Sequence, residues 1–412
     1  MKAQTLTVKA RIEGLSDRDA LTLGLLGYSA TKLWNMANWE RREVWGATGR
    51  IPSYGDQAKK LKTNRWYRSL HSQTAQAVLE ELDRSYRSWY ALRKKDKKAR
   101  PPGFRKRDSL STLTFKKSAV RIKGNTLRLS IPKKVYGRQF LKLKLRFSPG
   151  RKVEDPQIVR IVEDKGAWYA HITHDVPCPQ VAEAGHVMGI DLGEKVLAAC
   201  ASTDGSASLY PGGELRALDR YFSKESAKCN SSRSRKNGRL KRRWSRKRNY
   251  MLHVISKAIV CDAEARGVSH IVLGHPKGVR NDMQWGKKNN RRMHAWPYAK
   301  LISMVSYKAA LKGIETITVD ERGTSSKCCI CHYRDKKGRK TRGWWTCPQC
   351  GVSVHADING AVNILNEYLL EEGRTLPSLW SSGRLARPAI NRFAWGDPRP
   401  NDHEAGTVRQ AA

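Results

Sequence analysis

Two pairs of cysteines carry the most specific chemical signal in the sequence. Cys328 and Cys331 are separated by two residues, as are Cys347 and Cys350, and fifteen residues lie between the pairs. Two such knuckles can close a tetrahedral zinc site with four thiolate ligands. Because four protein ligands leave no open position, we expect one Zn²⁺ ion with a structural role. The same segment holds two competing ligands, Cys329 and His332. The spacing favours Cys328 over its neighbour.

A first aspartate lies where a strand can present it to a metal ion. In 187-VMGIDLGEKVLAAC-200, a short apolar strand delivers Asp191, Gly193 permits a tight turn, and a second strand returns from Val196. A carboxylate at the tip of a central strand is how ribonuclease-H-like folds present a metal ligand. The alternative interpretation is an aspartate that only caps a turn.

A second aspartate lies on a predicted helix. In 351-GVSVHADINGAVNILNEYLL-370, Asp357 shares its helical stripe with Ala361, Ile364 and Tyr368. A carboxylate on an apolar face is costly unless it is paired or bound to a metal. A helix N-terminus also favours negative charge, so an ordinary first-turn aspartate is the alternative. No Ser/His/Asp arrangement or phosphate-binding glycine loop competes with these acids for the chemistry.

The charge balance points to a polyanionic partner. The chain has 412 residues, with 79 Lys and Arg against 37 Asp and Glu, a formal charge of +42. Such an excess favours nucleic acid over a generally basic surface. The densest basic run is 233–248, which leads into a helix predicted over 249–267. We take its cations as the nucleic-acid-binding residues: Arg233, Arg235, Lys236, Arg239, Lys241, Arg242, Arg243, Arg246, Lys247 and Arg248.

The elements that must position these residues form two regions. Period-two alternation predicts short strands at 5–12, 111–134, 141–147, 157–164 and 167–175. A helical block follows the first strand, with one apolar stripe over 71–90 and Ser72 as its N-cap. This pattern favours a small β-barrel of the oligonucleotide-binding kind with a helical insertion. From about residue 185, strands alternate with helices, which predicts an α/β domain.

Several features bound the cellular setting. The sequence has no apolar run of 18 residues and no signal-peptide pattern at its start, so we expect neither membrane spanning nor secretion. Five of the nine cysteines fall within 328–350, which suits a reducing compartment with one metal site. Beyond Gly373 the chain is rich in Pro, Gly and Arg, which predicts an extended or disordered tail.

Four features follow one another in a distinctive order: a strand with Asp191, a basic helix, the paired CxxC knuckles, and a helix with Asp357. This order resembles TnpB, the family of transposon-encoded RNA-guided nucleases, and the compact type V CRISPR effectors related to them. The resemblance covers most of residues 1–370. It is strongest in GIDLG, TSSKCCIC, CPQCG and ADINGAVNI.

The resemblance implies a multidomain α+β fold and a guided nuclease. In the family, a guide RNA directs cleavage of double-stranded DNA next to a short flanking motif, which implies a prokaryotic, cytoplasmic protein. The implied parts are a wedge-like β-barrel (1–15 and 103–184), a helical recognition domain (16–102), a split, ribonuclease-H-like RuvC domain (185–327 and 351–370), a zinc ribbon (328–350) and a basic tail (371–412).

The sequence departs from the family at one acid. Family members usually carry a glutamate, the second of three metal-binding acids, where Gly274 stands in 271-IVLGHPKGVR-280. A substitute lies in 314-IETITVDERGTSSKC-328, where a strand ends at Asp320 and Glu321. In the ribonuclease-H-like sheet that the resemblance implies, the strand of Asp191 neighbours the 271–273 strand, and the 316–319 strand lies one place further out.

A glutamate one strand further out can reach the site. Neighbouring strands lie about 4.8 Å apart, and a glycine at 274 leaves room for a side chain that leans across it. A rearranged site of this kind also resembles one branch of the TnpB-like nucleases. We therefore predict a triad of Asp191, Glu321 and Asp357 that binds two Mg²⁺ ions. Asp320 and Asp282 are the fallback acids.

Two other functions stay open at this stage. One is an RNA-guided DNA-binding regulator without nuclease activity, which the missing acid at Gly274 favours and the three retained acids oppose. The other is an unguided nucleic-acid-binding protein with a zinc ribbon. The resemblance gives guide RNA and double-stranded DNA as the expected partners of the nuclease.

Overall fold

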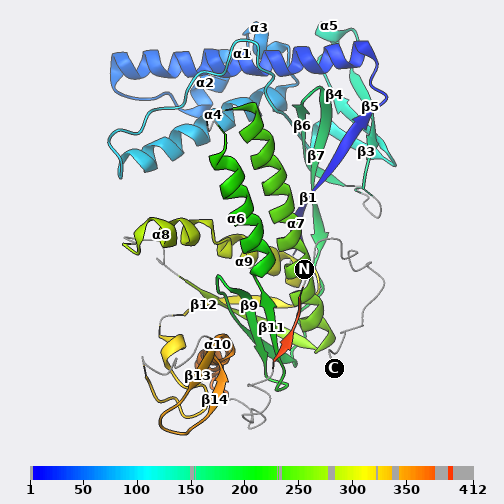
Figure 1. Ribbon diagram of the computed structural model, residues 1–412. Helices are drawn as coiled ribbons and strands as arrows, with labels where there is room; N and C mark the ends of the chain where they lie inside the picture. Colours follow the sequence, from blue (N-terminus) through cyan, green and yellow to red (C-terminus); the bar gives the residue numbers. More distant parts are fainter. Residues whose placement is uncertain are drawn as a thin grey trace. The chain divides into compact units, whose positions relative to one another are not determined.

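The structure is a computed structural model of the chain. It describes residues 3–148, 153, 155–229, 231, 234–276, 284–321, 323–335, 343–375 and 388–392. The chain forms two compact units, one over residues 5–176 and one over residues 177–412 together with residues 1–4 (Figure 1). No helix within the described ranges is long and apolar enough to cross a membrane.

The first unit contains a seven-stranded sheet of order β2-β6-β7-β1-β5-β4-β3. The first strand of the chain therefore lies at the centre of the sheet. The predicted strands are confirmed, and β3 and β4 form a hairpin around Gly124, whose φ of +56° suits glycine. The strands are β1 (Ala3–Glu13), β2 (Leu113–Lys116), β3 (Val120–Lys123), β4 (Thr126–Ser130), β5 (Phe140–Arg146), β6 (Pro156–Asp164) and β7 (Ala167–Pro177).

Four helices of the first unit lie between β1 and β2 in the sequence. They are α1 (Asp17–Thr48), α2 (Tyr54–Leu61), α3 (Arg65–Arg68) and α4 (Ser72–Arg93), and a short α5 (Lys133–Tyr136) follows β4. The predicted stripe on α4 is buried from Ala75 to Trp89. The predicted N-cap at Ser72 is wrong. His71 takes the cap position, because its carbonyl oxygen accepts the first helical hydrogen bond, from Ala75 N at 2.9 Å, while its own ψ of 139° is not helical.

The second unit is built on a six-stranded sheet of order β12-β11-β8-β9-β10-β15. β8 runs parallel to β11, and β11 runs parallel to β12, so these three strands end at the same edge. The predicted neighbourhood of the three strands is confirmed. The strands are β8 (His186–Asp191), β9 (Val196–Ser202), β10 (Ala207–Pro211), β11 (Val268–His275), β12 (Glu315–Asp320) and β15 (Ala389–Ile390).

Two layers cover this sheet. One core joins Met188, Ile190 and Leu273 to the helices α7 and α9, and the other joins Val187 and Val272 to α10 and the cysteine-rich segment. Alternate residues of β8 and β11 therefore face opposite layers. The helices are α6 (Gly213–Ala227), α7 (Arg235–Ala265), α8 (Gly286–Ala295), α9 (Tyr298–Ala310) and α10 (Ala356–Glu371).

Glycine lets α10 approach the central strand closely. A Cβ at Gly189 would lie 2.5 Å from the carbonyl oxygen of Ala361 and 2.7 Å from Cβ of Leu365. A larger residue at this position would push the helix away from β8. Because side chains alternate along a strand, Asp191, two residues later, points toward the same helix.

Two predicted boundaries differ from the structure. The predicted helix over 249–267 begins earlier, at Arg235, because arginine and lysine are good helix formers and Ser234 caps the helix. In 271-IVLGHPKGVR-280, Gly274 and Pro276 predict a turn after a strand over 271–273. This prediction is wrong at Gly274, because β11 continues to His275 and Gly274 pairs with Val319 of β12. The sequence showed a glycine and a nearby proline but not the partner strand that keeps the chain extended.

Candidate functional site

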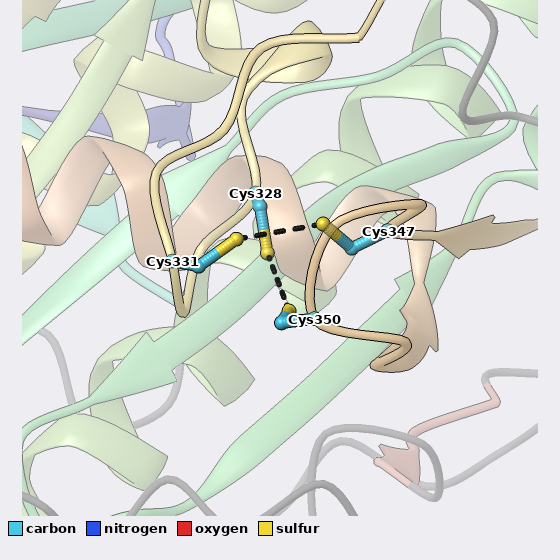
Figure 2. Close-up of side chains that lie close together, drawn as sticks. All are labelled: Cys328, Cys331, Cys347 and Cys350. Atoms are coloured by element: carbon cyan, nitrogen blue, oxygen red, sulfur yellow. Dashed lines mark hydrogen bonds between the residues drawn. The ribbon is translucent and has the colours of Figure 1, made fainter.

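The four predicted zinc cysteines come together in the structure. Within the described residues, Cys328, Cys331, Cys347 and Cys350 form the group whose ligand atoms all lie within 4.8 Å of one another. Figure 2 shows the four thiols pointing toward a common centre from two loops, with Sγ–Sγ distances of 3.8 Å (328 to 350) and 3.4 Å (331 to 347). Tetrahedral zinc with bonds of about 2.3 Å separates its sulfurs by about 3.8 Å. The donor set therefore fits one structural Zn²⁺ ion.

The competing ligands lie outside this cluster. Cys329 is buried, and its backbone N–H donates to Asn359 Oδ1 at 2.9 Å. His332 is exposed and has a positive φ of 60°. The structure thus brings Cys328, and not Cys329, into the group of four thiols. A two-stranded sheet of β13 (Trp344–Thr346) and β14 (Ser353–His355) carries the second cysteine loop, and the packing of Trp345 and Val354 joins it to α10.

Replacing Cys347 with serine should remove the zinc site. Loss of one of four thiolates is expected to lower the zinc content from one ion per chain to nearly none, because metal affinity and local folding are coupled. Metal analysis of the purified protein measures this result. Cys329→Ser is the matched control, since it changes an adjacent buried thiol outside the cluster. Equal zinc loss in both variants would contradict the assignment.

The first acid, Asp191, ends β8 beside α10. Its backbone pairs with Ala199 of β9, and the next strand brings Gly274 to the same level on the other side. A Cβ at Gly360 of α10 would collide with Asp191 Oδ2. Glycine at 360 therefore makes room for the Asp191 carboxylate against the helix.

The second acid, Glu321, reaches over Gly274 as the sequence predicts. A Cβ at Gly274 would lie 2.9 Å from Glu321 Oε2, 3.4 Å from Glu321 Cβ and 2.6 Å from Ile364 Cδ1. The space of the missing acid is thus occupied by a glutamate that follows the next strand. Its role as a metal ligand stays a prediction.

The third acid, Asp357, lies in the first turn of α10. Its backbone N–H donates to Nδ1 of His355, which caps the helix, at 3.3 Å. Gly360 follows it by three residues and therefore shares its face of the helix. α10 thus carries Asp357 and, one turn later, the glycine that accommodates Asp191.

The electrostatics of Glu321 suit a cation. Burial, and after it the neighbouring charge of Asp320, raises the pKa of the Glu321 carboxyl from its ordinary 4.5 to about 7. Its Oε2 is buried and has no hydrogen-bond partner among the described residues. An orphaned buried carboxylate oxygen is costly unless something pairs with it.

The three acids are less tightly gathered than the thiolates. Within the described residues, only the cysteine group has all its ligand atoms within 4.8 Å. Two metal ions about 4 Å apart are held from several sides, so their ligands need not touch one another. The oxygen donors and the orphaned Glu321 oxygen fit Mg²⁺ ions, which prefer carboxylates.

The fallback acids are placed differently. Asp320 is exposed and pairs with His275 at the end of β12, so its side chain lies on the face opposite that of Val319, which pairs with Gly274 and packs against the α10 core. Asp282 lies outside the described residues. Neither observation brings a second carboxylate to Gly274.

Sequence reasoning missed the residues that hold the acid-bearing segments. The turn after Asp191 is fixed by Glu194, which binds Arg292 of α8 at 2.9 and 2.5 Å and Arg216 of α6 at 3.5 Å. The buried Asn359 and Asn363 of α10 bind the segment that follows Glu321. The spacing of four residues in ADINGAVNI was a signal for the latter pair, because it places both amides on one helix face.

Most of the predicted nucleic-acid-binding cations lie in the first half of α7. The structure differs for Arg248, which is buried: its guanidinium lies 3.6 Å from Asp219 and 5.0 Å from the ring centre of Trp244. Lys247 is half-buried, and Arg233 lies outside the described residues. The exposed cations are Arg235, Lys236, Arg239, Lys241, Arg242, Arg243 and Arg246.

Fold and site together define a mixed α/β protein with a four-cysteine ribbon inserted next to a sheet edge that carries acids. A family model described as a Cas12f1-like TNB domain matches residues 298–364, and one described as a probable transposase matches residues 157–280. Within the second unit, these matches cover β8 to β12 of the six-stranded sheet, the cysteine-rich segment and the first part of α10.

Similar proteins agree with the family models. TnpB-like protein ORF457 of Acidianus two-tailed virus is 27% identical over an alignment 400 residues long. The alignment covers 82% of this chain and 81% of the relative. The putative RNA-guided DNA endonuclease InsQ of Escherichia coli is 23% identical over 335 residues, 77% of this chain and 79% of the relative. The CRISPR-associated endodeoxyribonuclease Cas12f1 of Sulfoacidibacillus thermotolerans is 29% identical over 226 residues, 50% of this chain and 52% of the relative.

A solved structure supports the same fold. The cryo-EM structure of a Cas12f1–sgRNA–target DNA complex contains a chain with a TM-score of 0.58 and 14% identity, covering 89% of this chain and 99% of that chain. By these family models and relatives, the chain is similar to TnpB-like proteins and to related compact type V CRISPR effectors.

Proposed function

We propose that this protein is an RNA-guided endonuclease that cleaves double-stranded DNA next to a short flanking motif. The observation that carries the proposal is the Glu321 carboxylate over Gly274, which supplies an acid where this chain lacks the glutamate usual in the family. The names of the relatives, which include RNA-guided and CRISPR-associated DNA endonucleases, support the guided activity. The formal charge of +42 suits binding to RNA and DNA backbones.

In this proposal, Asp191, Glu321 and Asp357 hold two Mg²⁺ ions at the edge where β8, β11 and β12 end. When bound, such ions activate the attacking water and stabilise the leaving 3′ oxygen of the phosphodiester. The chain positions its ligands from three elements: Asp191 from the central strand, Glu321 from the segment after β12, and Asp357 from α10. The apolar side chains between the sheet and α10 pack these elements against one another.

Guide pairing would supply the sequence specificity. In such systems the protein holds the heteroduplex by shape and charge and reads only the flanking motif. We propose that the exposed cations of α7 contact the phosphate backbone of the nucleic acid. We also propose that the chain is divided as the resemblance implies, into a barrel, a helical domain, a split RuvC domain, a zinc ribbon and a tail.

Two measurements test the proposed function together. The protein is purified with its bound RNA, the RNA is sequenced, and a plasmid that matches this RNA is incubated with the complex in Mg²⁺. We expect one structured RNA species and cleavage of the matched plasmid only. Absence of a defined RNA would favour an unguided binding protein. A defined RNA and guided binding without cleavage would favour the regulator, which the glycine at 274 suggests.

Binding of Mg²⁺ should depend on pH near neutrality. Glu321 can bind the ion only in its deprotonated form, and its pKa of about 7 lets protons compete with Mg²⁺ below that pH. We expect Mg²⁺ affinity to fall with pH by up to about tenfold per unit below 7, where an ordinary glutamate would lose it only near 4.5. The rise in unfolding temperature caused by Mg²⁺ at pH 6 and pH 7.5 measures this.

The metal-free protein should show the opposite trend in stability. The pKa of Glu321 is higher in the folded state, so the folded state binds more protons between about 4.5 and 7. Folding stability from this group is present below its unfolded pKa and is lost as pH rises through the folded pKa. Glu321→Gln removes the titrating group. It should therefore reduce the pH dependence of Mg²⁺ binding and that of the stability of the metal-free protein. An unchanged pH response in that variant would contradict the assignment.

A further inference from the structure

The segment after Glu321 begins with a tight turn that is closed on the acid itself. The β11–β12 ladder ends at His275 and Asp320, so Glu321 lies just beyond the last paired residue. Thr324 Oγ1 donates to the Glu321 carbonyl oxygen at 2.9 Å, and Thr324 N does so at 3.3 Å. Gly323, with φ of +85°, permits the reversal. Thr324 therefore holds the Glu321 backbone where the strand no longer does.

Two buried asparagines of α10 bind this segment from the other side. Asn363 Nδ2 donates to the carbonyl oxygens of Thr324 at 2.8 Å and Lys327 at 2.7 Å. Asn359 Nδ2 donates to the Lys327 carbonyl at 2.8 Å, while Asn359 Oδ1 accepts from Cys329 N at 2.9 Å. Both asparagines are 0% exposed. The segment is thus attached to the helix that carries Asp357 by four side-chain hydrogen bonds.

These asparagines are not explained by helix stability. Asparagine is a weak helix former, and a buried amide costs free energy unless it is fully bonded. Asn363 Oδ1 has no hydrogen-bond partner among the described residues, so its burial is only half compensated. Both side-chain amides donate to the same segment, which connects Glu321 to the first zinc knuckle.

We propose that Thr324, Asn359 and Asn363 are positioning residues for Glu321, which hold its carboxylate over Gly274 by tying its segment to α10. The inference rests on the proposed function, in which Glu321 is a metal ligand. The connection runs from the zinc knuckle at Cys329 through Asn359 and α10 to Asn363, Thr324 and Glu321. The acid is therefore fixed by the same helix that presents Asp357.

Hydrogen exchange on the full chain with its bound RNA tests this role. Exchange is followed by mass spectrometry for residues 315–329, with and without increasing Mg²⁺, alongside the Mg²⁺ dependence of cleavage. In Asn363→Ala and Thr324→Val we expect faster exchange of this segment without Mg²⁺. We expect the Mg²⁺ concentration for half-maximal protection and for half-maximal cleavage to rise about tenfold or more. Zinc content should stay at one ion per chain.

Matched variants separate positioning from general damage. Thr324→Ser keeps the hydroxyl and should restore the parent behaviour. Asn366→Ala removes another buried asparagine of α10, and Ser326→Ala removes a hydroxyl that donates to Gly323 instead of Glu321; both should leave the Mg²⁺ dependence unchanged.

The outcomes also distinguish this inference from the proposed function. If Glu321→Gln weakens Mg²⁺ protection but Asn363→Ala and Thr324→Val do not, the positioning role is overturned while the site stands. If Glu321→Gln itself leaves Mg²⁺ protection unchanged, the acid assignment fails first. If Asn366→Ala raises the Mg²⁺ requirement as much as Asn363→Ala does, the effect is general to α10 and the positioning role is overturned.

Discussion

Replacement of Glu321 by glutamine is expected to reduce DNA cleavage by roughly a thousandfold. The substitution keeps the size of the side chain over Gly274 but removes the charge that would bind Mg²⁺. Loss of a metal ligand costs several kcal/mol of transition-state stabilisation, and about 1.4 kcal/mol corresponds to each factor of ten. Single-turnover cleavage of a matched plasmid by the parent and the variant measures the ratio. Asp191→Asn should produce a loss of similar size.

Two controls make the Glu321 result specific. Asp320→Asn changes the adjacent exposed acid, which is a fallback candidate, and Glu315→Gln changes an acid at the other end of β12. Both should retain activity within a few-fold of the parent. The RNA content and zinc content of Glu321→Gln should match the parent, because neither depends on this charge. Full activity in Glu321→Gln, or its loss in Asp320→Asn, would refute the relocated acid.

The parts of the site that sequence predicts well are those set by short-range chemistry. Cysteine spacing predicted the four thiols that the structure brings together, because two knuckles of this kind have few other uses. The short apolar run before Asp191 placed this residue at the end of a strand, and the ribonuclease-H-like sheet implied by the resemblance predicted which strands neighbour it. The reach of Glu321 over Gly274 followed from the strand order and the absence of a side chain on the middle strand.

The parts that sequence could not give depend on tertiary contacts. Nothing local shows that Gly360 accommodates the Asp191 carboxylate, since the two residues are far apart in the chain. The roles of Thr324 and Asn363 depend on a loop carbonyl that only folding brings to α10. Arg248 was one cation among ten in the sequence, and only packing against Asp219 distinguishes it. α7 begins at Arg235, earlier than predicted, because the Ser234 cap and the helix propensity of its Arg and Lys residues outweigh the density of like charges in this run.

Replacement of Gly274 by alanine should also impair cleavage, by about tenfold or more. Alanine in a strand interior normally stabilises a protein relative to glycine by roughly 0.5–1 kcal/mol. Here the new methyl group would meet Glu321 Oε2 at 2.9 Å and Ile364 Cδ1 at 2.6 Å, so a side chain must move. We expect reduced cleavage and weaker Mg²⁺ binding with little change in unfolding temperature. Gly213→Ala, where a Cβ meets nothing within 4 Å, is the control.

A second substitution identifies which of the two contacts matters. Ile364→Val removes the Cδ1 atom that would collide with the new methyl group, but it leaves the contact with Glu321. If the displaced carboxylate causes the loss, the double variant Gly274→Ala/Ile364→Val should be as impaired in Mg²⁺ binding as Gly274→Ala. If activity returns in the double variant, the loss came from strain against α10, and the glycine at 274 serves packing instead of the acid. The distinction is direct because both neighbours of the missing Cβ are known and one can be removed without touching the other.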